Sequence, residues 1–140
     1  MDTIRANEAI ARLMSSADPE HFRLKYEQWN DMLYITLRAN SAPSTAIQLQ
    51  NGWLLRINRE TGDPFGFMIE NAMWQASQED DDGILFQLIE HADFADAEPA
   101  ELKLKRSIGI YPAGFDVLTA YLEEEAPKLE TTKDKASYAI

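Results

Sequence analysis

The feature that most constrains the fold is an alternation of apolar and polar residues between positions 22 and 70, interrupted at short intervals by turn residues. Alternation of this kind places every second side chain on the same face of a β-strand. The pattern divides into about five strands, and Asn51-Gly52 between two of them is a strong signal for a tight hairpin. The sequence therefore predicts an antiparallel β-meander of about five strands, a type of sheet that usually buries one face.

The second of these strands indicates which side chains each face receives. Leu33, Ile35 and Leu37 alternate with Met32 and Tyr34, so we expect the first three to face the core and the other two to face away. An apolar opposite face must contact the chain's own C-terminal half, another copy of the chain or a partner protein. The aromatic and methionine residues that could form such a face are Trp29, Met32, Tyr34, Trp53, Met68 and Trp74.

Helical periodicity flanks the sheet segment on both sides. Apolar residues in 3–17 recur at spacings of three and four, which predicts an amphipathic helix that covers the sheet. Residues 74–101 contain nine acids and no Lys or Arg. Farther along, helical spacing predicts short helices at 84–89 and 115–125, and alternation predicts another strand at 102–110.

These elements fit one α+β domain with a helical C-terminal extension. A chain of 140 residues is long enough to bury a single core. We expect the domain to span 1–126, with the sheet core at about 22–72, an acidic and helical extension at 74–126, and a flexible tail at 127–140. No run approaches the roughly 20 apolar residues that cross a bilayer, and the chain has no cysteine. We therefore expect a cytoplasmic protein that does not enter a membrane.

Residues 25–72 resemble a known family. The pattern "YEQWNDMLYITL" followed by "NGWLLRINRETGDPFGFMIENA" is similar to the bacterial proteins of domain-of-unknown-function family 2283. The chain departs from that pattern at Asn58, at Phe65-Gly66 and in "FMIENA". The resemblance implies a compact antiparallel sheet without established catalytic residues, and it favours partner binding because some members resemble components of toxin–antitoxin loci. The matching positions are Tyr26, Asp31, Leu33, Tyr34, Ile35, Gly52, Gly62, Gly66 and Ala72.

No cluster of residue types in the sequence indicates a catalytic, cofactor or metal site. His21 and His91 are the only histidines, and neither has neighbours at metal-ligand spacing. Asp80, Asp81 and Asp82 lack the alternating ligands of a calcium loop, so we interpret them as a solvated helix start, with a loosely bound divalent ion as the alternative. The net charge of −11 argues against direct binding to nucleic acid.

Two classes of function remain, and the lack of a catalytic constellation favours the first. The first is a non-enzymatic protein-interaction module, such as an antitoxin-like protein, an inhibitor or an accessory subunit in a bacterial or phage system, which binds a basic partner or self-associates. Its expected contact residues are Met32, Tyr34, Arg38, Met68, Asp80, Asp81 and Asp82. The second is an enzyme dependent on a small ligand or divalent metal, with a cleft between the sheet and the C-terminal helices that uses Asp31, Tyr34, Arg56 and Glu70.

Overall fold

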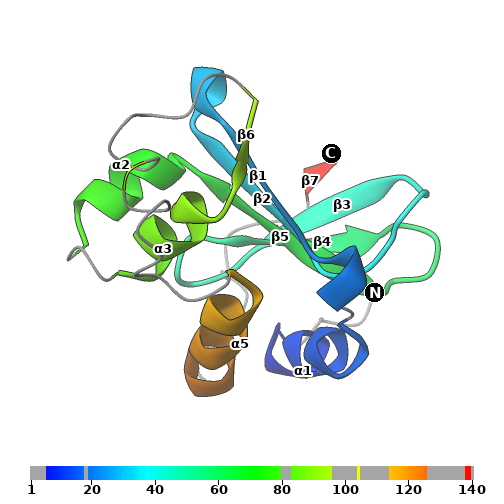
Figure 1. Cartoon of the computed structure of the whole chain (residues 1–140). Coiled ribbons are helices and arrows are strands. Elements are labelled where there is room, and N and C mark those ends of the chain that lie inside the picture. Colours follow the sequence, from blue (N-terminus) through cyan, green and yellow to red (C-terminus); the bar gives the residue numbers. More distant parts are fainter. Residues whose placement is uncertain are drawn as a thin grey trace.

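The computed structural model contains a mostly antiparallel sheet with helices on one face and at one end (Figure 1). It describes residues 6–17, 19–79, 83–95, 104, 114–125 and 138–139. The helices are α1 (Ala6–Ser16), α2 (Ala72–Ser77), α3 (Ile84–Glu90) and α5 (Gly114–Glu125), with 3-10 turns at Pro19–His21 and Gln28–Asn30. The strands are β1 (Arg23–Glu27), β2 (Met32–Thr36), β3 (Ser44–Gln48), β4 (Leu54–Asn58), β5 (Pro64–Glu70), β6 (Asp93–Phe94) and β7 (Tyr138–Ala139).

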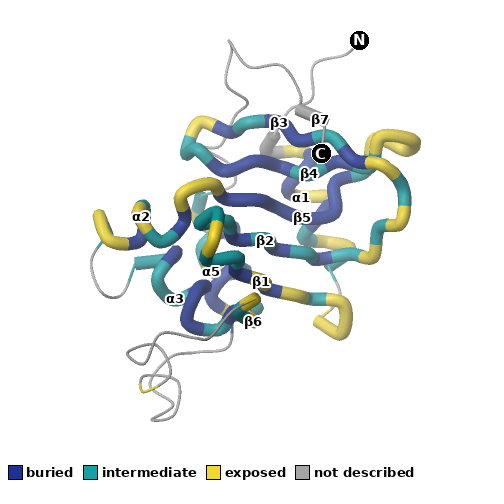
Figure 2. The backbone as a smooth tube through the Cα atoms, turned by 90° about the horizontal axis from the view of Figure 1, so that it is seen from above, coloured by how far each residue is buried: buried dark blue, intermediate teal, exposed yellow. Residues whose placement is uncertain are grey.

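The predicted α+β class, the N-terminal helix over the sheet and the helical C-terminal part are confirmed, but the strand order differs from a simple meander. The order is β6-β1-β2-β5-β4-β3-β7, so the β1–β2 hairpin joins the sheet through β5 and not through β3. The reason lies in β5, which is buried along its length except at Glu70 (Figure 2). A strand that is apolar on both faces belongs in the middle of a sheet, with neighbours on both sides.

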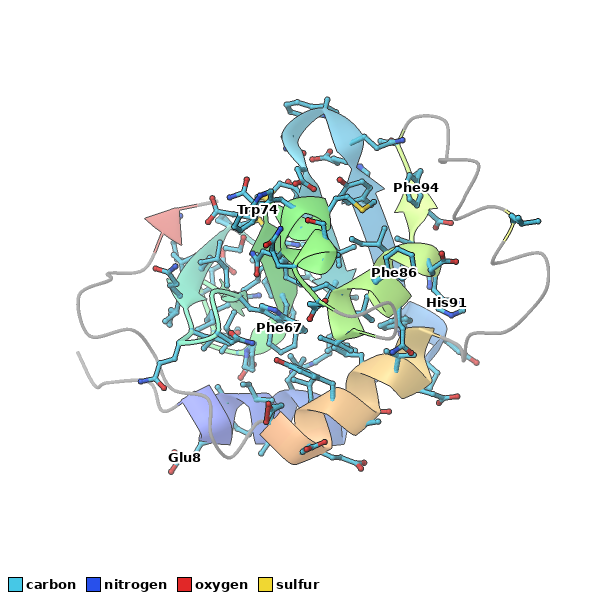
Figure 3. The ribbon with its side chains drawn as sticks, turned by 90° about the vertical axis from the view of Figure 1, so that its left-hand side faces the viewer. Glu8, Phe67, Trp74, Phe86, His91 and Phe94 are labelled. Atoms are coloured by element: carbon cyan, nitrogen blue, oxygen red, sulfur yellow. The ribbon has the colours of Figure 1, made fainter. Side chains whose placement is uncertain are left out.

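The core lies between the sheet and the helices, on what we call the first face. The expected orientation of β2 is confirmed, because Leu33, Ile35 and Leu37 are fully buried there. Figure 3 shows α1 and α5 on the same side of the sheet, with Phe67 pointing toward them. The helices contribute Ala9, Ile10 and Leu13 from α1, Ala72 and Ala76 from α2, Leu85, Leu88 and Ile89 from α3, and Val117, Leu118 and Leu122 from α5.

A β-bulge changes the direction of one aromatic side chain. The register between β4 and β5 shifts between Arg56 and Ile57. Simple alternation would place Phe65 on the first face with Phe67, but its ring lies under the Arg56 guanidinium on the opposite face, 4.8 Å from ring centroid to Cζ. Trp53 also differs from expectation. It is only 2% exposed and belongs to the core, where its ring stacks on Tyr121 at 5.1 Å between centroids.

Several sequence predictions fall wholly or partly outside the described residues. Asp80, Asp81 and Asp82 are among these. Among the described residues, the Leu85 N–H at the start of α3 donates to the Glu79 carboxylate at 3.1 Å. Of the strand predicted at 102–110 only Leu104 is described, and it is helical. In the tail predicted to be flexible, β7 pairs with β3. Among the described helices, none has the length and apolar character needed to cross a bilayer.

Candidate functional site

The second face of the sheet, opposite α1 and α5, is where chemically distinctive side chains meet. Of the described helices, none lies across it (Figures 1 and 3). Strand pairing arranges its residues in three rows that run across the sheet. These rows are Glu27, Met32 and Glu70; then Lys25, Tyr34, Met68 and Leu54; and then Arg23, Thr36, Gly66, Arg56 and Ala46.

Three of the predicted contact residues come together on this face. Met68 is buried there with Ala46 and Leu54, and Met32 and Tyr34 pack against that small cluster. Arg38 follows β2, and its backbone N–H donates to the Phe65 carbonyl oxygen at 3.2 Å. Asp80, Asp81 and Asp82 lie outside the described residues.

Arg56 is the most unusual charged residue of the second face. Its guanidinium carbon lies 5.7 Å from the centroid of the Tyr34 ring and 4.8 Å from that of Phe65, so it has cation–π contacts with two rings. Its Nε is buried and finds no hydrogen-bond acceptor among the described residues. Burial lowers the pKa of Arg56, and the neighbouring Tyr34 opposes that shift. A buried donor without an acceptor destabilises a fold, so its presence here requires an explanation.

A pocket of about 300 Å³ opens beside Arg56 and crosses β1, β2 and β4. Gly66 of β5 stands between Thr36 and Arg56 in the register, so the row has no side chain at that position. A Cβ atom at Gly66 would collide with the Ile35 carbonyl oxygen, which makes glycine the residue that fits. We call this site the basic pocket, and its lining consists of Arg23, Lys25, Glu27, Tyr34, Thr36 and Arg56.

The charges of the basic pocket do not cancel. It contains three cationic side chains and one carboxylate, that of Glu27. Glu27 lies 3.7 Å from the Lys25 ammonium and accepts a hydrogen bond from the Asn30 amide at 3.1 Å. Burial raises the pKa of Tyr34, and its hydrogen bond to Glu27 raises it further, so the hydroxyl stays protonated at neutral pH. The pocket therefore has a formal charge of about +2 in a chain whose net charge is −11.

Asp31 connects the β1–β2 turn to α2. Its backbone is left-handed, with φ at 52°, a conformation that Asp tolerates better than most residues. One carboxylate oxygen accepts hydrogen bonds from the Tyr26 hydroxyl at 2.5 Å and the Met73 N–H at 2.7 Å. The other accepts from the Trp74 N–H at 3.3 Å. Asp31 thus caps α2 from a distant part of the chain, since Asn71, at the N-cap position, makes no side-chain cap.

This connection fixes the positions of two exposed tryptophans at one end of the sheet. Trp29 is 75% exposed in the β1–β2 turn, and Trp74 is 64% exposed in the first turn of α2. Figure 3 shows Trp74 on the side of α2 remote from α1 and α5. In the adjoining row of the second face, Met32 is flanked by two acids. We call this group the tryptophan end, which consists of Glu27, Trp29, Met32, Glu70 and Trp74.

The cleft expected for an enzyme does not bring its suggested residues together. A groove of about 450 Å³ lies between α3 and α5, lined by Ile84, Gln87, Asp116, Val117, Ala120, Tyr121 and Glu124. Tyr34 and Arg56 lie across the sheet from it, Asp31 caps α2, and Glu70 is exposed at the end of β5. In the part of the chain that the structure describes, no group of three or more His, Asp or Glu side chains is placed to hold a metal ion.

Comparison with known proteins adds no functional information. No family model, curated protein or solved structure matches the chain. The resemblance of residues 25–72 to family 2283 therefore stays a prediction. The basic pocket was not predicted as a site, although Tyr34 and Arg56 were both named for the alternative enzyme cleft. The only signal in the sequence was Gly66 within an otherwise apolar strand, which often marks a close approach of backbone or ligand.

Proposed function

We propose that this protein is a non-enzymatic interaction module that binds a partner protein at the tryptophan end. The observation that supports this most strongly is the exposure of Trp29 and Trp74 at positions fixed by Asp31. Tryptophan is among the residues most enriched at the energetic centres of protein interfaces. Because the backbone beneath both rings is already ordered, binding would lose little conformational entropy there.

The charges at the tryptophan end favour a partner with basic groups beside apolar ones. Glu27 and Glu70 flank Met32, and the exposed carboxylate of Glu70 could pair with Arg or Lys of the partner. The exposed indole rings can also bind a cation on their faces. A second copy of the chain would bring like charges together, and the net charge of −11 would oppose that association while attracting a basic protein.

This chemistry agrees with the expectation of an antitoxin-like protein, an inhibitor or an accessory subunit in a bacterial or phage system. Each of these acts by occupying a surface of another protein and needs no catalytic group of its own. We further propose a cytoplasmic location, which the lack of cysteine supports.

The experiment that tests this proposal is quantitative capture from an extract of the source organism with matched variants. The test variant is Trp29→Ser/Trp74→Ser, and the control is Leu104→Ser, because Leu104 is also 64% exposed but lies outside the sheet. We expect a nuclease-resistant, salt-sensitive partner that wild type and Leu104→Ser retain and that the double variant loses. Equal recovery of every protein by all three baits, or light scattering that shows only self-association of the chain, would refute the proposal.

A further inference from the structure

The basic pocket presents charged groups that the fold itself does not need. Arg56 has no ion-pair or hydrogen-bond partner among the described residues, and its Nε is buried. An apolar side chain of similar length at this position would contact the same two rings without leaving a donor unsatisfied. The rings of Tyr34 and Phe65 hold the guanidinium in one place, as is required of a group that binds a ligand.

The other donors of the pocket are placed around the same space. Arg23 is oriented by hydrogen bonds from its Nη1 to the backbone carbonyls of Glu20 and Phe22, at 2.9 and 2.7 Å. Lys25 supplies a third cation, whose side chain is 58% exposed. The Thr36 hydroxyl lines the pocket and can donate to an oxygen atom. The Tyr34 hydroxyl lines it too, but its one proton is donated to the Glu27 carboxylate.

We infer that the basic pocket binds a phosphate group, with Arg56 as its principal ligand and Arg23, Lys25 and Thr36 as further donors. The formal charge of the pocket, about +2, complements the charge of about −1.5 to −2 that a phosphate monoester carries at pH 7. Guanidinium groups bind phosphate through parallel N–H donors, and two of them border this pocket. Glu27 opposes the binding of an anion, but it is partly neutralised by Lys25.

The size of the pocket limits what carries the phosphate. Its volume of about 300 Å³ is at the lower end of the range for small-molecule sites. The group therefore belongs either to a small phosphorylated molecule or to a phosphorylated side chain of a protein. This inference goes beyond the proposed function, because the pocket and the tryptophan end share only Glu27 and either could exist without the other.

The test is a titration followed by nuclear magnetic resonance on the ¹⁵N-labelled full chain at neutral pH. Sodium phosphate is the probe, with sodium chloride and sodium acetate as controls at equal ionic strength. We expect a saturable shift of the Arg56 Nε–H signal and of the Thr36 amide with phosphate alone. Equal shifts with chloride would show only screening, and equal affinity for acetate would show a general anion site, so either result would overturn the inference.

Variants distinguish a specific phosphate site from general electrostatic attraction of anions. Arg56→Met should weaken phosphate binding at least about tenfold, since hydrogen bonds to charged groups are among the strongest in proteins. Lys25→Gln, at an exposed position, should weaken it about threefold. Arg12→Gln is the matched control, because it removes the same charge from an exposed residue of α1 on the other side of the sheet. Equal affinity in Arg56→Met and Arg12→Gln would refute the assignment.

Two further probes identify the source of the phosphate. Phenyl phosphate represents a small molecule, and a short phosphoserine peptide represents a modified protein. Binding of one at least about tenfold more tightly than inorganic phosphate would assign the pocket to that source. The Trp29→Ser/Trp74→Ser variant should bind phosphate as the wild type does. That result would hold even if no partner protein were found, so a failure of one proposal is distinguishable from a failure of the other.

Discussion

Asp31 offers a sharp test of how the β1–β2 turn is joined to α2. Replacing it with glycine removes three hydrogen bonds to one carboxylate, from the Tyr26 hydroxyl and from the N–H groups of Met73 and Trp74. Glycine adopts the left-handed backbone at this position without strain, so the Asp31→Gly variant isolates the contribution of the carboxylate.

The expected loss can be estimated from these contacts. Removing a helix cap costs about 1 kcal/mol, and losing a hydrogen bond to a charged group costs about 1.5–3 kcal/mol. We therefore expect Asp31→Gly to lower the free energy of unfolding by about 3 kcal/mol, a large share of the roughly 5–15 kcal/mol typical of a domain. Asp31→Ala should lose about 1 kcal/mol more because of its left-handed backbone. Asp31→Asn should lose less than either, since it tolerates that backbone and keeps one acceptor oxygen.

Urea denaturation followed by circular dichroism measures these differences, provided that the slope with urea stays constant. A double-mutant cycle with Tyr26→Phe then isolates the contact at 2.5 Å, for which we expect a coupling of about 1.5–3 kcal/mol. A loss below about 1 kcal/mol in Asp31→Gly, together with a coupling below about 0.5 kcal/mol, would refute the reasoning. The connection between the turn and α2 would then contribute little to stability.

Other substitutions test the faces of the sheet and its titrating groups. Ile35→Asp should unfold the domain because it buries an unpaired charge. Tyr34→Ala should instead keep a cooperative urea transition. Loss of that transition in Tyr34→Ala would show that we assigned the faces of β2 wrongly. Arg56→Met should raise the free energy of unfolding by about 1 kcal/mol. An unsatisfied buried donor costs about 1–3 kcal/mol, and the cation–π contacts of Arg56 offset only part of that cost. A urea midpoint below that of the wild type would contradict this prediction. Burial raises the pKa of Tyr26 and Tyr121, so the unfolded chain loses these protons first, and stability should be full below about pH 10 and fall above it. Tyr26→Phe should flatten that alkaline loss in thermal unfolding measured against pH.

The orientation of side chains could be predicted from the sequence because it depends on local geometry. Alternation in β2 assigns Leu33, Ile35 and Leu37 to one face whatever strand lies beside them. The helices α1, α3 and α5 were found for the same reason, since their spacing is a property of each segment alone. The alternation in β2 did not predict its neighbour, because an alternating strand has the same pattern beside β3 as beside β5. The signal for the central place of β5 was its continuous apolar run.

The candidate sites depend on longer-range geometry, which the sequence pattern does not contain. The basic pocket needs Arg23, Thr36, Gly66 and Arg56 in one row, and that row follows from the pairing of four strands. The bulge beside Arg56 then turns Phe65 toward the guanidinium. At the other site, Asp31 has the appearance of an ordinary turn residue in the sequence. Its role as the cap of α2 becomes visible only when β2 and β5 are paired.

The outermost strands of the sheet have a consequence for the newly made protein. β6 pairs with β1 through Lys25 and Tyr26, and β7 pairs with β3 through Thr45 and Ala46. Because both segments follow the five central strands in the chain, the ribosome completes those strands while their two edges are still open. Open edges pair readily with other chains. Aggregation during synthesis should therefore be greatest before β6 and β7 are made, and a deletion of residues 138–140 would leave the β3 edge open permanently.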